Sequence, residues 1–154
     1  MTLEGLADAL RRAGVSENSI GTAITILGNL GQFDPDKGLP KAPDDWFGGQ
    51  EQNYPARSNI NFIPSAHKGA CHDLLITVCA GEGNFDLNTM ETIALCINCH
   101  RTIKAVIIAT DYWLEKGFNK WRKPTFKALH DQFGIIFFIF TPHAGRWIVN
   151  PIAL

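Results

Sequence analysis

Several features that would fix the class of the protein at once are missing from the chain. No apolar run reaches the ~18 residues that a membrane-spanning helix needs, and the longest, residues 134–140, has the length of a strand. The first residues, MTLEGLADALRRAG, contain no basic segment followed by an apolar one and therefore do not resemble a secretory signal. Internal repeats and low-complexity segments are absent too. Together these absences predict a cytoplasmic protein that has no membrane partner.

Cysteine is scarce, with four residues in 154. Disulfides are rare in the reducing cytoplasm, so these cysteines are expected to be free thiols, metal ligands or catalytic groups. They are Cys71, Cys79, Cys96 and Cys99.

The length of 154 residues suits one domain with one core, and a composition of 45% apolar and 19% charged residues is ordinary for a globular protein. We expect a single domain over residues 1–154. It divides into a helical N-terminal part (1–31), a long loop rich in Pro, Gly and Asp (32–57) and an α/β core (58–154). Trp46 is expected to anchor the loop.

Hydrophobic periodicity and helix-capping signals predict the order of the elements: two helices, the loop, then β-α-β-α-β-β. This order predicts an α/β or α+β fold, in which helices pack on a small mixed sheet. Six strand residues are expected to be nearly inaccessible to solvent. They are Leu74, Ile76, Val78, Ile107, Ile136 and Phe138.

The segment ETIALCINCHRTIKA, residues 91–105, carries the most specific chemistry. Cys96 and Cys99 have the spacing of a zinc-ligand pair, and His100 follows them. On a straight strand Cys71 and Cys79 would lie roughly 26 Å apart, at about 3.3 Å per residue, and could not share one ion. A metal site would therefore take its other ligands from His100 and from either Cys71 with His72 or Cys79. On a helix, the same thiols would be small buried residues.

The same segment resembles the second half of the HNH nuclease motif, in which Leu-Cys leads into a Cys-x-x-Cys-His knuckle and a helix. INFIPSAHKG, residues 60–69, is more loosely similar to the first half of that motif. Asn61 stands where the family has its catalytic histidine, so His67 or His72 would take that role. The resemblance implies a metal-dependent endonuclease, or a degenerate nucleic-acid-binding relative, that holds zinc through Cys71, Cys96, Cys99 and His100.

Hydrolysis at such a site needs an open metal position for water and a neighbouring histidine that takes the proton from this water. His67, His72 and Asp73 are the candidate catalytic residues on this hypothesis.

A basic tract between residues 101 and 127 supports a nucleic-acid partner. Its bases alternate with Tyr112, Trp113, Trp121 and Phe126, and bases interleaved with aromatic residues can grip phosphates and stack on nucleobases. The alternative is a solvated helix face whose aromatic residues turn inward. The candidate nucleic-acid-binding residues are Lys120, Arg122, Lys123 and Lys127.

Two other functions stay open. Cys71 could act as the nucleophile of a thiol hydrolase or deamidase, with His143 as its base. The chain could instead be a non-enzymatic inhibitor or adaptor that binds a protein partner and keeps its thiols buried.

Overall fold

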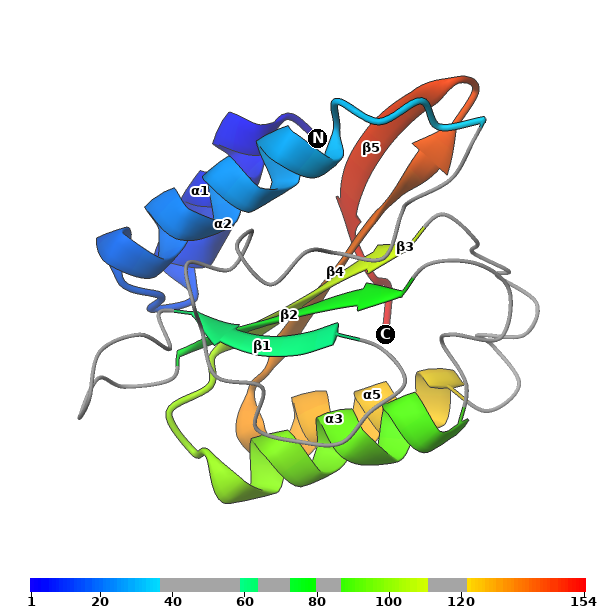
Figure 1. The fold of residues 1–154 in the computed structure, drawn as a ribbon. Helices are drawn as coiled ribbons and strands as arrows, with labels where there is room; N and C mark the ends of the chain where they lie inside the picture. The colour runs from blue at the N-terminus through cyan, green and yellow to red at the C-terminus, as the bar shows by residue number, and fades with distance from the viewer. Residues whose placement is uncertain (37–58, 64–72, 80–86, 111–121) are drawn as a thin grey trace.

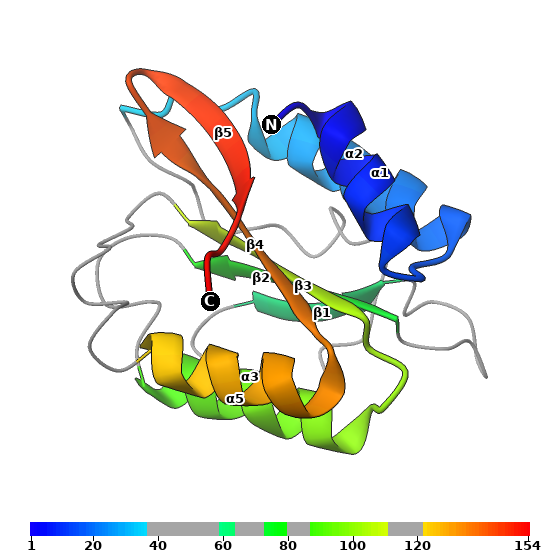
Figure 2. The same ribbon diagram turned by 180° about the vertical axis from the view of Figure 1, so that it is seen from behind.

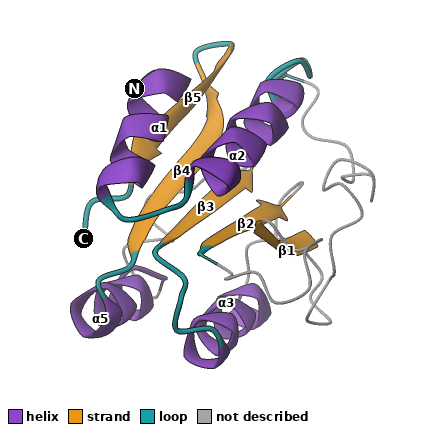
Figure 3. Ribbon diagram, turned by 90° about the vertical axis from the view of Figure 1, so that its left-hand side faces the viewer, coloured by secondary structure: helices purple, strands orange, loops and turns teal. Residues whose placement is uncertain are grey.

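The computed structural model describes residues 1–36, 59–63, 73–79, 87–110 and 122–154. These residues form three layers, in which a five-stranded mixed sheet lies between two pairs of helices (Figures 1 and 3). The expected fold class and the two N-terminal helices are confirmed. Among the described helices, none combines the length and the apolar character that crossing a bilayer requires.

The N-terminal pair, α1 (Leu3–Arg12) and α2 (Glu17–Leu30), begins at two side-chain caps, Thr2 and Ser16. The Thr2 hydroxyl accepts a hydrogen bond from the Gly5 amide at 3.0 Å, and the Ser16 hydroxyl accepts one from the Ser19 amide at 3.3 Å. Each cap satisfies an amide that the first helical turn leaves without a backbone partner. Gly14, at φ +92°, turns the chain between the two helices.

The sheet has the order β1-β2-β3-β4-β5. The three central strands, β2 (Leu74–Cys79), β3 (Ala105–Thr110) and β4 (Ile136–His143), run parallel. Both outer strands, β1 (Asn59–Ile63) and β5 (Arg146–Pro151), are antiparallel to their neighbours. β4 and β5 form a hairpin whose two turn residues, Ala144 and Gly145, both have positive φ.

Parallel neighbours need crossover connections, and α3 (Leu87–Cys99) and α5 (Lys123–Phe133) supply the two helices. Both cover the face opposite to α1 and α2 (Figures 1 and 2). Each helix runs back across the sheet, so the starts of α3 and α5 lie on the side where β2 and β3 end. We call this side the carboxyl edge and the opposite side, where β2 and β3 begin, the amino edge.

The sheet separates two apolar clusters. The cluster under α1 and α2 contains Ile107 and Phe138, whereas the cluster under α3 and α5 contains Val106 and Phe137. Phe126 of α5 stacks on Phe137 with ring centroids 4.3 Å apart.

The predicted core is largely confirmed. Leu74, Ile76, Ile107 and Phe138 are at most 1% exposed. Ile136 is only half-buried, because it is the first residue of β4. The side chain of Val78 and the loop containing Trp46 lie outside the described residues.

The predicted order of elements omits β1. In the structure β1 pairs with β2 over five residues, from Asn59 opposite Val78 to Ile63 opposite Leu74. A five-residue edge strand gives a weak periodic signal in the sequence. Its place in the sheet depends on pairing with β2, which begins eleven positions after the last residue of β1.

Asp73 joins the helical layer to the sheet. Its carboxylate accepts a hydrogen bond from the Ser16 amide at 2.8 Å and one from the Ser19 hydroxyl at 2.5 Å. Its carbonyl accepts from the Lys104 amide at 2.8 Å. A carboxylate at a helix start is also stabilised by the helix dipole. One residue before β2 therefore fixes α2 and the start of β3.

We expect Asp73→Asn to lower the free energy of unfolding by about 1–3 kcal/mol, because the amide NH₂ group would face one of the two donors and leave it unpaired. The matched control is Asp131→Asn, which breaks an exposed ion pair with Lys127 and should cost at most about 1 kcal/mol. Urea denaturation of both variants measures the difference. Equal unfolding midpoints would contradict the role assigned to Asp73.

Candidate functional site

The Cys-x-x-Cys pair lies in the last turn of α3 rather than on a turn between elements. Cys96 is fully buried within the apolar cluster under α3 and α5, while Cys99, three residues later, is exposed. The His100 amide donates to the Cys96 carbonyl at 2.9 Å, which extends the helical hydrogen bonding by one residue. The two thiols are neighbours on the helix but face different surroundings.

Burial in this apolar cluster, together with the nearby Cys99 thiol, raises the pKa of Cys96 to about 12. Metal binding and nucleophilic attack both use the thiolate. In the arrangement seen here Cys96 is a neutral packing residue at neutral pH. Of the other two candidate ligands in the segment, Cys99 is exposed and His100 is half-buried.

The predicted metal and catalytic residues are only partly placed. Cys71, His67 and His72 lie outside the described residues, as does Lys120. Asp73 lies at the amino edge, where its carboxylate already serves the start of α2. Within the described ranges, no group of three or more His, Cys, Asp or Glu side chains is close enough to share a metal ion.

The dyad proposed for Cys71 and His143 is likewise not assembled by the described residues. His143 is exposed at the end of β4, beside the hairpin turn. Cys71 belongs to a range that the structure does not describe.

The structure does place three of the four predicted nucleic-acid-binding residues together. Arg122 and Lys123 are half-buried at the start of α5, and exposed Lys127 follows one turn later. Lys127 makes an ion pair with Asp131 at 3.1 Å, in which both side chains are more than half exposed. Such a pair contributes at most about 1 kcal/mol and leaves the lysine accessible to another anion. The three bases thus lie along the beginning of one helix at the carboxyl edge.

The start of α5 differs from the starts of α1 and α2. The first turns of those helices contain Glu4 and Glu17, and each helix has a side-chain cap. The first turn of α5 has no acidic residue, and Arg122, at its N-cap position, makes no side-chain capping hydrogen bond. Pro124 in that turn suits a helix start, because proline lacks the amide that an inner turn would require.

Buried polar groups collect near the ends of the parallel strands. Thr110 is the last residue of β3 and lies opposite Cys79 of β2. In β4, Thr141 comes one residue after Phe140, which lies opposite Ala109 of β3. Thr77, Thr110 and Thr141 are all at most 8% exposed, and the Thr77 hydroxyl has no hydrogen-bond partner among the residues that the structure describes. The sequence does not single out these threonines, because only the strand register brings them together.

We expect alkylation at pH 8 to modify Cys99 readily and to leave Cys96 unmodified until the protein unfolds. The reason is that Cys96 is inaccessible and its raised pKa keeps the thiol protonated. Iodoacetamide labelling followed by peptide mass mapping resolves each cysteine. Equal labelling of the two thiols in the folded state would show that α3 does not bury Cys96.

Cys96 also makes stability depend on alkaline pH. Its pKa is about 12 in the folded protein against 9.0 for a free thiol, so the unfolded state releases this proton first. The stabilising contribution is complete below about pH 9 and decreases as the pH rises towards 12. The stability difference between the wild type and Cys96→Ala should shrink over that window. A difference that stays constant from pH 8 to pH 11, measured by urea denaturation, would contradict this account.

No family model, curated protein or solved structure matches the chain. The likeness of residues 91–105 to the HNH motif therefore stays a prediction.

Proposed function

We propose that the protein binds nucleic acid at the carboxyl edge of its sheet, where Arg122, Lys123 and Lys127 contact phosphates. The observation that supports this most directly is the charge at the start of α5. Bases occupy the position where α1 and α2 carry acids. The proposal places the protein in the cytoplasm, where it can meet nucleic acid.

Positive charge at a helix start works against the helix dipole. Each unfavourable charge costs about 0.3–1 kcal/mol at an exposed site. A phosphate bound beside Arg122 and Lys123 would reverse this penalty, because an anion is favoured both by the bases and by the dipole.

The position of these bases agrees with the way parallel sheets bind ligands. In open α/β sheets ligands bind in the crevice outside the carboxyl ends of the strands, where the connections to the helices meet. Arg122 directly follows the connection between β3 and α5, and Lys120 belongs to that connection in the sequence. The bases of this tract are groups that hold phosphates, whereas its described aromatic residue, Phe126, is buried against Phe137 and cannot stack on a nucleobase.

A nuclease activity would add a metal to this binding function. On the HNH resemblance, zinc would be held by Cys96, Cys99 and His100 with Cys71. Cys96 and Cys99 lie in the last turn of α3, at the amino edge, and His100 directly follows it, whereas Cys71 is not described. Elemental analysis and an oligonucleotide cleavage assay test the metal and the cleavage apart from binding. Bound zinc with no cleavage would indicate the degenerate relative.

We expect the double variant Arg122→Ala/Lys123→Ala to bind a fluorescein-labelled oligonucleotide at least tenfold more weakly than the wild type, since two charge-assisted phosphate contacts are lost. Each lost contact should also reduce the slope of log K against log salt by roughly 0.7–0.9. Fluorescence anisotropy at several salt concentrations, with single-stranded and duplex probes, measures both effects.

The matched control is Lys104→Ala. Lys104 is exposed just before β3, at the amino edge, so this variant removes the same type of charge from the opposite side of the sheet. It should bind like the wild type. If the control and the double variant weaken binding equally, binding depends on net charge alone and the assignment of the site is wrong.

A further inference from the structure

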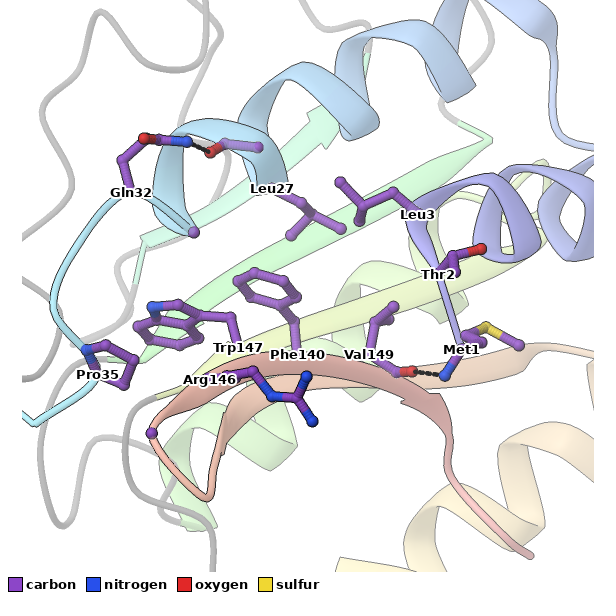
Figure 4. A pocket seen from close by; sticks show the side chains of 13 residues that line it. Met1, Thr2, Leu3, Leu27, Gln32, Pro35, Phe140, Arg146, Trp147 and Val149 are labelled. Carbon is purple, nitrogen blue, oxygen red and sulfur yellow. Dashed lines mark hydrogen bonds between the residues drawn. The ribbon is translucent and has the colours of Figure 1, made fainter.

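A cavity of about 510 Å³ lies on the opposite face of the sheet from α5. It opens between the start of α1, the end of α2 and the β4–β5 hairpin (Figure 4). This volume is within the range of sites that hold small organic molecules. Neither the basic start of α5 nor the cysteine segment contributes a residue to it.

One wall of the cavity is aromatic and fixed in place. Phe140 and Trp147 stack nearly parallel, with ring centroids 5.1 Å apart and an interplanar angle of 8°. The indole N–H of Trp147 donates to the Phe33 carbonyl at 2.8 Å. This hydrogen bond fixes the indole ring to the segment that directly follows α2. Leu27 and Val149 extend this wall with aliphatic groups (Figure 4). A preformed aromatic wall favours a flat ligand, because the side chains that contact the ligand lose little conformational freedom when it binds.

The cavity also presents a cation. Arg146 precedes Trp147 in β5, and its exposed side chain lines the cavity (Figure 4). No ion pair or hydrogen bond of its guanidinium is found with any residue that the structure describes. A guanidinium matches the geometry of carboxylate and phosphate groups, to which it can donate two parallel hydrogen bonds.

The α2 side of the cavity is kept open by glycine. A Cβ atom built on Gly28 would meet no atom of the described residues within 4 Å, so none of them fills the space in front of this helical residue. A larger side chain at this position would extend into unoccupied space without a clash at its base.

From these features we propose that the cavity binds a small planar aromatic molecule that carries a carboxylate or phosphate group. The ring lies against the Phe140–Trp147 wall, and the anionic group pairs with Arg146. This binding is independent of nucleic-acid binding at α5, because the two sites share no residue and lie on opposite faces of the sheet.

The test uses ¹H–¹⁵N NMR and follows the indole N–H resonance of Trp147, assigned from its loss in Trp147→Phe. AMP and naphthalene-2-carboxylate are the planar anionic probes. Adenosine lacks the anion, and ribose 5-phosphate lacks the ring. We expect the two planar anions to shift the Trp147 resonance saturably, with dissociation constants of about 1 mM or below, and the two partial probes to bind at least tenfold more weakly.

Arg146→Ala should raise the dissociation constants of both planar anions by roughly tenfold, which is the usual effect of losing one charge-assisted contact. Gly28→Leu should abolish the shift by filling the cavity. Gly21→Leu is its matched control, since Gly21 also lies in α2 with open space before it but does not line the cavity. The control should bind like the wild type. No saturable shift with either planar anion, or the same shift in Gly28→Leu, would overturn the proposal.

Discussion

The burial of β3 on both faces is the constraint on which the rest of the structure depends. All six of its residues are buried, and the first five, Ala105 to Ala109, alternate between the two apolar clusters. A strand of this kind can exist only if helices cover both sides of the sheet, which is why parallel sheets occur in layered α/β proteins. α1 and α2 supply one cover, and α3 and α5 the other.

This arrangement leaves the strand ends and the helix starts as the places where polar chemistry can collect. α3 and α5 must return across the sheet, and so they begin at the carboxyl edge, where β2 and β3 end. The bases at the start of α5 and the buried Thr110 and Thr141 therefore lie on the same side of the molecule without being neighbours in the sequence. At the amino edge, the matching polar group is Asp73, and its carboxylate is used to hold α2.

Much of the fold could be predicted from local signals. The caps Thr2 and Ser16 mark the starts of α1 and α2, and Gly134, at φ +73°, ends α5 as a glycine C-cap does. Apolar runs of strand length correctly located β2, β3 and β4.

The features that escaped prediction depend on contacts between distant parts of the chain. Asp73 caps a helix 57 positions earlier, and Trp147 bonds to Phe33 across 114 positions. No short sequence pattern predicts contacts between residues so far apart in the chain. The Cys-x-x-Cys spacing also could not show that one thiol faces the core and the other the solvent.

The proposed binding of nucleic acid at the carboxyl edge is tested most directly by amide chemical-shift mapping with a short unlabelled oligonucleotide. The largest shifts should fall on the amides of residues 122, 123 and 125–127 at the α5 start and on that of Thr110 at the end of β3. The chemical shifts of the amides of α1 and of residues 103–105 at the amino edge should change little. Shifts concentrated at the amino edge, or spread evenly over the surface, would contradict the claim.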